Sequence, residues 1–238
     1  MKLVQTKGKV LNPEDDPEYW NSMGYSLALN GKRDKAQKYY EKTLEIDPDN
    51  VAALNNLANI LLDQGKKDEA LKYLKYTTQM HPDYAEAWIN LGLINEEANK
   101  VDEAMKCYDR AKDLDPGCAA LWHNRGYALR RLNKFREAIA DYDTSLRLRP
   151  LHVSTLMDKA FAHMSISEVD EADRCYDDVL KIEPNHAEAL GDKGTVQFAR
   201  GNYREALLLF DKSLKMEPNN AKLLNYRRIA SEKITENN

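Results

Sequence analysis

Six of the eight prolines recur at a constant interval of 34 residues, and this interval constrains the fold more than any other feature of the chain. They are Pro48, Pro82, Pro116, Pro150, Pro184 and Pro218. Proline interrupts a helix, because its ring clashes with the preceding turn and its nitrogen carries no hydrogen to donate. A helix-ending residue at one fixed interval, without any insertion, predicts six copies of a single supersecondary unit.

Further columns of residues follow the same 34-residue step. Small residues form two of them: Gly24, Ala58, Gly92, Gly126, Ala160 and Gly194, then Ala36, Ala70, Ala104, Ala138, Ala172 and Ala206. Large apolar residues form two more: Trp20, Leu54, Trp88, Trp122, Leu156 and Leu190, then Tyr40, Leu74, Tyr108, Tyr142, Tyr176 and Phe210. Small side chains let two helices approach closely, and large ones fill the gaps between helix pairs. Each repeat is therefore predicted to be two packed helices.

A fifth column lies between the two predicted helices of each repeat. It consists of Gly31, Gly65, Asn99, Asn133, Ser167 and Gly201. Glycine and asparagine tolerate the left-handed backbone conformation that ends a helix. This column is therefore predicted to be the turn.

These columns resemble the tetratricopeptide repeat (TPR) family, whose pattern joins a Trp-x-x-Leu-Gly helix to an Ala-x-x-x-Phe helix and a closing proline. The third repeat matches best, with Trp88, Leu91, Gly92, Ala104, Tyr108 and Pro116. The resemblance implies an all-α fold, a right-handed α-solenoid of six helix-turn-helix units with a C-terminal capping helix. The expected boundaries are 1–16 for a loosely ordered N-terminal segment, 17–50, 51–84, 85–118, 119–152, 153–186 and 187–220 for the repeats, and 221–238 for the capping helix and tail.

The cysteines and the apolar runs indicate the compartment. Cys107, Cys118 and Cys175 are odd in number and form no Cys-x-x-Cys pair, which is typical of free thiols in a reducing compartment. The first residues lack the apolar run of a signal peptide, and no stretch approaches the ~18 consecutive apolar residues of a membrane-spanning helix. We expect a soluble, cytoplasmic protein without membrane insertion.

In the TPR family the first helix of each repeat lines a concave groove, and ligands usually lie there. Carried over residue by residue, the resemblance predicts a partner-binding face with amides, rings and charges in the early repeats and apolar groups in the late ones. Its residues are Asn21, Tyr25, Asn55, Asn56, Asn59, Asn90, His123, Asn124, Tyr127, Arg130, Met157, Phe161 and Phe198. Tyr25, Tyr127 and Phe161 are the expected hot spots, because aromatic side chains dominate interface energetics.

One row of this face, Asn56, Asn90 and Asn124, repeats at the 34-residue step. Such a ladder of amides could grip the backbone of an extended peptide, since each amide offers two donors and an acceptor. The same amides could instead bond to a neighbouring helix or to water. The sequence leaves both interpretations open.

Charge is distributed unevenly among the repeats. The fourth repeat carries +4, between a third at −4 and a fifth at −5, and the net charge of the chain is −4. The arginines of the fourth repeat could bind an anion or could pair with their acidic neighbours. The negative net charge argues against nucleic-acid binding. The predicted face of the first three repeats contains no cation, which argues against a clamp for a terminal carboxylate.

A row of cations at the 34-residue step departs from the family pattern. It consists of Arg125, Lys159, Lys193 and Arg227, where the early repeats have leucine. Cations at a half-buried column need partners. We expect Asp158 and Asp192, in the preceding column, to supply them.

No catalytic or cofactor-binding constellation is present. The five histidines and three cysteines lack metal-ligand spacing, and the chain has neither a glycine-rich phosphate loop nor a Gly-x-Ser-x-Gly elbow. We therefore expect no cofactor and no enzymatic activity. The leading hypothesis is a scaffold that binds an extended peptide or helix of a partner protein in the groove. The alternative is a self-assembling array, in which the terminus of one protomer docks in the groove of another.

Overall fold

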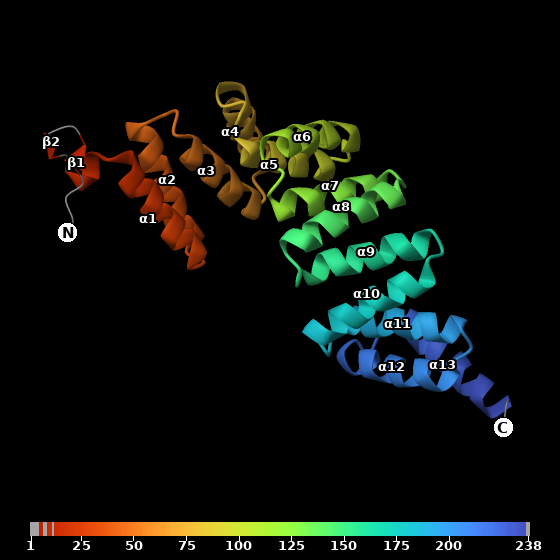
Figure 1. Ribbon diagram of the computed structural model, residues 1–238. Helices are drawn as coiled ribbons and strands as arrows, with labels where there is room; N and C mark the ends of the chain where they lie inside the picture. Colours follow the sequence, from red (N-terminus) through yellow and green to blue (C-terminus); the bar gives the residue numbers. More distant parts are fainter. Residues whose placement is uncertain (1–4, 7–8, 11, 237–238) are drawn as a thin grey trace. The chain divides into compact units, whose positions relative to one another are not determined.

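The computed structural model describes residues 5–6, 9–10 and 12–236, and this part of the chain is built of helices apart from one short strand pair (Figure 1). The helices are α1 Pro17–Leu29, α2 Arg33–Ile46, α3 Val51–Asp63, α4 Lys67–Met80, α5 Ala85–Glu97, α6 Val101–Leu114, α7 Ala119–Arg131, α8 Phe135–Leu148, α9 Val153–Ser165, α10 Val169–Ile182, α11 Ala187–Ala199, α12 Tyr203–Met216 and α13 Ala221–Glu236. The predicted all-α class is confirmed.

The segment before α1 forms three short elements. Strands β1 (Gln5–Thr6) and β2 (Lys9–Val10) pair antiparallel, and the 3₁₀ helix η1 spans Pro13–Asp15. The indole Nε1 of Trp20 donates a hydrogen bond to the backbone oxygen of Glu14 over 2.8 Å, which ties η1 to α1. The expectation of loose order for 1–16 falls partly on 1–4, 7–8 and 11, which lie outside the described residues.

The turn column behaves as predicted. Its six residues all have positive φ, between 58° for Asn133 and 78° for Gly201. The residue after each of them donates its amide to a carbonyl five residues back, as Lys100 does to Asn95 over 2.8 Å. This bond closes the first helix and directs the chain into the second one.

The glycine column sets how closely the two helices of a repeat approach. A Cβ atom on Gly92 would lie 2.5 Å from Cε1 of Tyr108, and one on Gly194 would lie 2.6 Å from Cε1 of Phe210. Both rings are fully buried. In the second repeat the glycine is replaced by Ala58 and the ring by the smaller Leu74, so the pair still fits.

The chain divides into two compact units, 1–116 and 117–238, each with its own apolar clusters. In unit 1 the pairs are α1 with α2, α3 with α4, and α5 with α6, and the first helices α1, α3 and α5 contact one another in sequence order. In unit 2 the pairs are α7 with α8, α9 with α10, and α11 with α12; α7 also contacts α9, and α13 packs against α12 and α11. None of the described helices is both long and apolar enough to cross a bilayer.

Candidate partner-binding face

The side of the first helices on which the sequence places the predicted partner-binding residues is called here the first-helix face. In unit 1 its amides bond to one another across repeats. Asn90 Nδ2 donates to Asn55 Oδ1 over 2.8 Å, Asn56 Nδ2 donates to Asn21 Oδ1 over 3.4 Å, and Asn55 Nδ2 donates to Glu86 Oε2 over 3.2 Å. Asn21 and Asn55 are buried. These bonds favour the second interpretation of the amide ladder, in which asparagines join neighbouring helices.

Tyr25 and Asn59 complete the predicted set in unit 1. The Tyr25 side chain is 54% exposed on α1, and Asn59 is half-buried on α3. The packing column that fills the gaps between helices is a different one, which contains the buried Tyr40. The exposed Tyr25 ring is therefore available to a ligand.

In unit 2 an arginine lies between two aromatic rings of the predicted set. The guanidinium carbon of Arg130 is 4.5 Å from the ring centroid of Tyr127 on α7 and 4.6 Å from that of Phe161 on α9. Its Nη2 lies 3.6 Å from Oδ1 of Asp158. Cation–π contacts of this kind hold a guanidinium in a fixed plane. One face of the Phe161 ring is occupied in this way, and the side chain is still 50% exposed.

His123 belongs to the interior of unit 2 rather than to its surface. Its side chain is 19% exposed, and its Nδ1 lies 2.9 Å from Thr155 Oγ1, which in turn lies 2.7 Å from Nδ1 of His152. Burial lowers the pKa of His123 to about 4, and the nearby His152 and Arg130 act in the same direction. The imidazole is therefore neutral at physiological pH and joins α7 to α9.

A pocket of about 270 Å³ opens on the first-helix face of unit 2. Its lining consists of Arg130, Val153, Ser154, Met157, Asp158, Phe161, His186, Glu188 and Asp192. Three predicted residues, Arg130, Met157 and Phe161, therefore meet at one site. Phe198 does not join them, because its ring packs 5.3 Å from those of Tyr203 and Tyr226. Asn124 is half-buried on α7 and does not line the pocket.

The carboxylates of this pocket were not among the predicted site residues. Burial raises the pKa of Asp158, against the opposing effect of Arg130, and burial also raises the pKa of Asp192, against the opposing effect of Lys222. Glu188 and Asp192 also line a second cavity of about 270 Å³, together with Gly191, Glu217, Asn220, Lys222 and Leu223. The sequence signal was the continuation of the Asn56–Asn90–Asn124 column as two aspartates.

The prediction that Asp158 and Asp192 neutralise the cation row is wrong. The row pairs with aspartates of the second helices: Lys159 with Asp143 at 2.7 Å, Lys193 with Asp177 at 3.0 Å, Arg227 with Asp211, and Arg125 with Asp141 at 2.7 Å. Asp143, Asp177 and Asp211 themselves recur every 34 residues. Lys159, Lys193 and Arg227 turn toward the second helix that precedes them, whereas Arg125 pairs with Asp141 on α8, the second helix of its own repeat.

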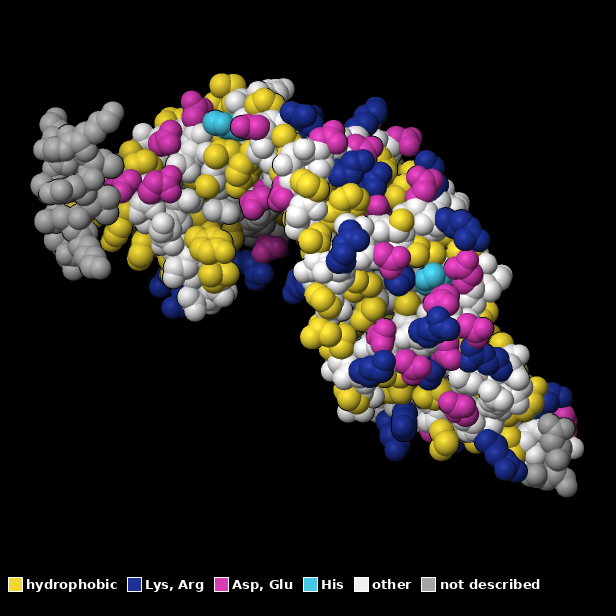
Figure 2. Space-filling model, in the orientation of Figure 1, with side chains coloured by type: hydrophobic (Ala, Val, Ile, Leu, Met, Phe, Trp, Pro, Cys, Tyr) yellow, Lys and Arg dark blue, Asp and Glu magenta, His cyan; other side chains and the backbone are white. Residues whose placement is uncertain are grey.

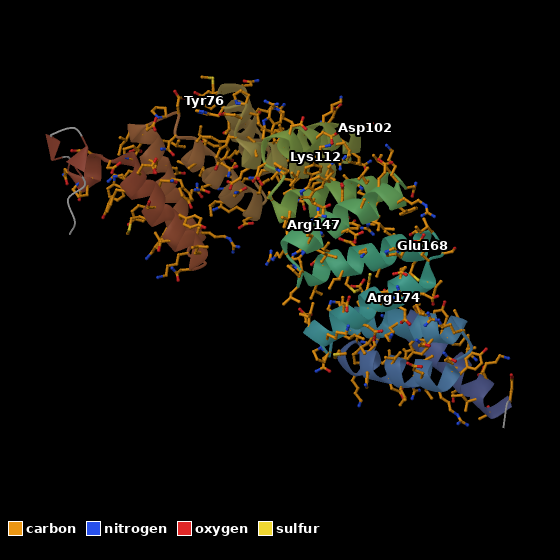
Figure 3. All side chains as sticks on the ribbon, in the orientation of Figure 1. Tyr76, Asp102, Lys112, Arg147, Glu168 and Arg174 are labelled. Atoms are coloured by element: carbon orange, nitrogen blue, oxygen red, sulfur yellow. The ribbon has the colours of Figure 1, made fainter. Side chains whose placement is uncertain are left out.

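Several other arginines of the fourth repeat bond to neighbouring side chains. Arg136 Nη1 lies 3.2 Å from Glu168 Oε1, and Arg147 Nη2 donates to Thr144 Oγ1 over 3.3 Å (Arg147 and Glu168 are labelled in Figure 3). Figure 2 shows basic and acidic side chains interspersed over the visible surface of α8 to α13. This arrangement favours pairing with acidic neighbours over an anion-binding band.

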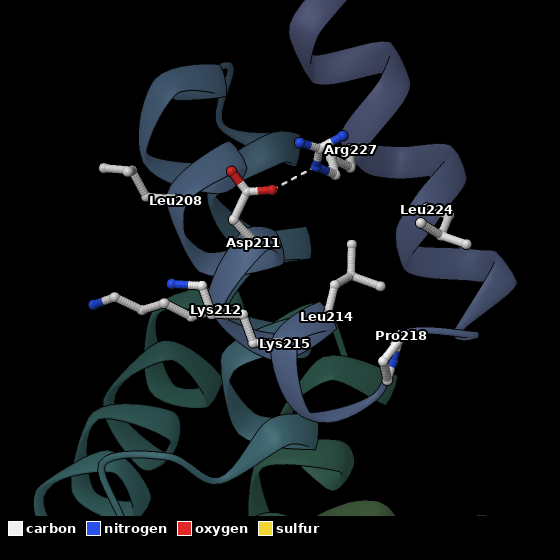
Figure 4. A pocket seen from close by; sticks show the side chains of 8 residues that line it. All are labelled: Leu208, Asp211, Lys212, Leu214, Lys215, Pro218, Leu224 and Arg227. Carbon is white, nitrogen blue, oxygen red and sulfur yellow. Dashed lines mark hydrogen bonds and ion pairs between the residues drawn. The ribbon is translucent and has the colours of Figure 1, made fainter.

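A further pocket, of about 590 Å³, lies between α12 and α13 (Figure 4). Leu208, Leu214, Pro218 and Leu224 form its apolar part, and the Arg227–Asp211 ion pair lies at its edge. Leu224 is 45% exposed, whereas the equivalent Leu54 and Leu190 are each 3% exposed, because a second helix covers them. The side of α13 that faces this pocket therefore exposes an apolar residue next to the Arg227–Asp211 ion pair.

Three family models, each described as a tetratricopeptide repeat, match the chain. One matches 57–118 and 157–221, which is more than half of the chain, a second matches 27–75 and a third matches 119–151. Together with the helix pairs, these matches show that the chain belongs to the TPR family. A search of curated proteins finds no significant match.

Solved structures with the same fold are numerous but distant in sequence. The Pseudomonas aeruginosa protein PilF aligns with a TM-score of 0.79 at 20% identity, over 93% of this chain and 100% of its own. YrrB, titled a TPR protein with an unusual peptide-binding site, aligns with a TM-score of 0.68 at 19% identity, over 79% of this chain and 97% of its own. A chain of the APC/C hetero-tetramer Cut9–Hcn1 aligns with a TM-score of 0.76 at 17% identity over 91% of this chain, which spans 43% of that longer one. At these identities the likeness shows the fold alone.

Proposed function

We propose that this protein is a protein–protein interaction scaffold that binds an extended segment or a helix of a partner in a groove lined by its first-helix faces. The observation that carries the proposal is the exposure of Tyr25 and Phe161, at 54% and 50%, on helix positions whose large apolar side chains are not needed for packing. Exposed aromatic residues beside polar groups are typical of interface hot spots. The TPR fold, and a neighbour titled as peptide-binding, support the same function.

The proposal is of a non-catalytic, cytoplasmic protein. Burial raises the pKa of the Cys175 thiol to about 11, and it also raises the pKa of Cys107. A thiol becomes a nucleophile only as the thiolate, so neither cysteine is poised for catalysis at neutral pH. Both thiols are free, which agrees with a reducing compartment.

The test compares the proteins that the intact chain captures from a lysate with those captured by Tyr25→Ala and Phe161→Ala variants. Truncating a hot-spot aromatic residue costs about 2 kcal/mol or more of binding free energy, which corresponds to roughly a 30-fold loss of affinity. We expect the same proteins to be lost or strongly depleted. The matched control is Leu151→Ala, a 72% exposed side chain in the turn before α9. Equal capture by all four proteins would exclude the first-helix face.

The apolar α12–α13 pocket favours a second candidate, a self-assembling array of copies. Exposed Leu208 and Leu224 would be covered by another copy in such an array. Sedimentation velocity over a hundredfold range of concentration distinguishes the two. A monomer at every concentration excludes the array. An oligomer that dissociates when both leucines are changed to serine supports it, and removal of 1–16 then tests whether the terminus takes part.

A further inference from the structure

We infer that the pocket between α9 and α11 is a subsite for a basic side chain of the partner, a lysine or arginine that has an apolar residue next to it. The inference rests on the proposed function and specifies the chemistry of the bound segment. Three observations support it: the positions of Asp158 and Asp192, the mixed apolar and acidic lining of the pocket, and the ion pairs formed by the residues around it.

The carboxylates of Asp158 and Asp192 lie in the same pocket, at equivalent positions of two successive repeats. Asp158 and Asp192 are 34 residues apart, so they occupy equivalent positions on consecutive first helices, and both side chains line the same pocket. Glu188, one turn before Asp192 on α11, adds a third carboxylate to the lining. Val153, Met157 and Phe161 supply apolar walls. The pocket therefore combines negative charge with apolar surface.

The folded chain leaves these carboxylates largely without strong partners. The nearest cation to Asp158 is the Arg130 guanidinium at 3.6 Å, beyond hydrogen-bonding distance, and His123 at 3.8 Å is neutral. Asp192 forms neither a hydrogen bond through its carboxylate nor an ion pair with any described residue. The cations of the neighbouring row, which could have reached them, pair with Asp143 and Asp177 instead.

Burial is costly for a carboxylate that is only partly compensated, and it raises the pKa of both aspartates although Arg130 opposes it at Asp158 and Lys222 opposes it at Asp192. A cation that enters the pocket removes this cost, because it replaces the lost hydration of the charged form. An anionic segment would instead meet three carboxylates at close range. Charge complementarity of this kind selects one class of partner and repels the other.

The exposed ring of Phe161 adds a preference for the form of the cation. A guanidinium can bond a carboxylate in a bidentate manner and stack on an aromatic ring at the same time, which an ammonium group cannot do equally well. Arg130 already stacks on this ring from α7. The half-buried Met157 and the 37% exposed Met164 offer adaptable apolar surface for the neighbouring residue. We expect arginine to bind more tightly than lysine.

The experiment selects binders from a displayed library of random nonapeptides on the immobilised full chain and then measures their affinities by fluorescence anisotropy. The selected peptides should contain an arginine or lysine beside an aliphatic or aromatic residue. Their affinity should fall at least tenfold in the Asp158→Asn/Asp192→Asn double variant and should weaken with added salt. Asparagine preserves shape, and a thermal melt verifies that the variant is folded.

The matched control removes two negative charges elsewhere in the same unit. Asp178→Asn/Glu183→Gln changes two exposed acids at the end of α10 and just after it, outside the pocket, and it should leave the affinity unchanged. An equal loss of peptide affinity in this control would mean that the basic peptide is attracted by the overall negative charge of the unit, and it would overturn the subsite.

The remaining outcomes separate the subsite from the proposed function. Peptides without basic residues, or peptides that lose affinity in Phe161→Ala but not in the aspartate variant, would overturn the subsite and leave the proposed function standing. No selected peptide at all, or peptides insensitive to every first-helix variant, would overturn both.

Discussion

At the scale of single residues, the contact between Gly194 and Phe210 fixes how closely α11 and α12 approach. We predict that Gly194→Ala destabilises the protein by about 1 to 3 kcal/mol, because the new methyl group overlaps the ring. The better helix propensity of alanine, worth up to about 1 kcal/mol, opposes this loss without cancelling it. Urea unfolding followed by circular dichroism measures the difference.

The second repeat indicates a second substitution that should compensate for Gly194→Ala. There Ala58 stands where Gly194 does, and Leu74 stands where Phe210 does. Adding Phe210→Leu to Gly194→Ala should therefore cost less than the sum of the two single changes. Simple additivity in the double-mutant cycle would show that the helices move apart instead.

His123 should make stability depend on pH. Its folded pKa of about 4 lies below the ordinary value of 6.5, so the unfolded state binds a proton that the folded state excludes. The contribution of neutral His123 to the free energy of unfolding is therefore fully present above about pH 6.5. It is lost as the pH falls toward 4, by up to about 3 kcal/mol. The His123→Gln variant lacks this titration. The wild-type free energy of unfolding should therefore fall relative to the variant between pH 7 and 4, and parallel curves would contradict the assignment.

Asp192 should show the opposite sign. Its folded pKa lies above the ordinary 3.8, so the charged form is disfavoured in the fold. The penalty is complete above the folded pKa and vanishes as the pH falls to the unfolded value. We predict that Asp192→Asn raises the Tm at pH 7 and that the gain disappears near pH 4. The control Asp178→Asn, at an exposed pair with Lys181, should not raise it.

At the scale of helices, ion pairs at the 34-residue step join α9, α11 and α13 to the second helix that precedes each of them. Lys193 shows the pairing best, with Nζ 2.6 Å from Asp173 and 3.0 Å from Asp177 and a side chain that is 11% exposed. The neighbouring aspartates hold the pKa of Lys193 above its ordinary value, although burial works against them. A half-buried ladder of this kind helps to set the register between repeats.

We predict that Lys193→Met destabilises the protein by about 1 to 3 kcal/mol, because it removes a buried charge and two bonds to carboxylates. The matched control is Lys181→Met, which breaks the exposed pair with Asp178 and should change stability by less than about 0.5 kcal/mol. Chemical denaturation of both variants at the same salt concentration makes the comparison. Equal effects would show that the ladder contributes no more than a surface pair.

At the scale of the whole molecule, stability should vary along the chain, because each repeat contacts only its neighbours. Among the described helices, α13 packs against α12 and α11, and it is held by Leu223, which is 4% exposed and lies next to Gly191. We predict that Leu223→Ala speeds amide hydrogen exchange throughout α13 and leaves α9 unchanged. Uniform faster exchange over all of unit 2 would instead indicate that the unit unfolds as one body.

The sequence by itself determined the helix pairs, the turns and the family. Each of these depends on the 34-residue step and on local chemistry: prolines that interrupt helices, turn residues such as Asn99 that accept positive φ, and a glycine or alanine opposite each large side chain of the second helix. Because the same packing and turn positions recur in six repeats, the 34-residue pattern remains recognisable even where one repeat has a different residue.

Only the tertiary structure decided which side chains are satisfied and which are left for a partner. The sequence pointed to Asp158 and Asp192 as partners of the cation row, but Lys159 and Lys193 pair with aspartates of the preceding second helices. Likewise, Asn55 and Asn90 bond to each other, and Phe198 packs between two tyrosines. Such pairings depend on the direction of a side chain between helices, which residue spacing does not specify. They leave an acidic pocket beside Phe161 as the part of the first-helix face most ready to bind.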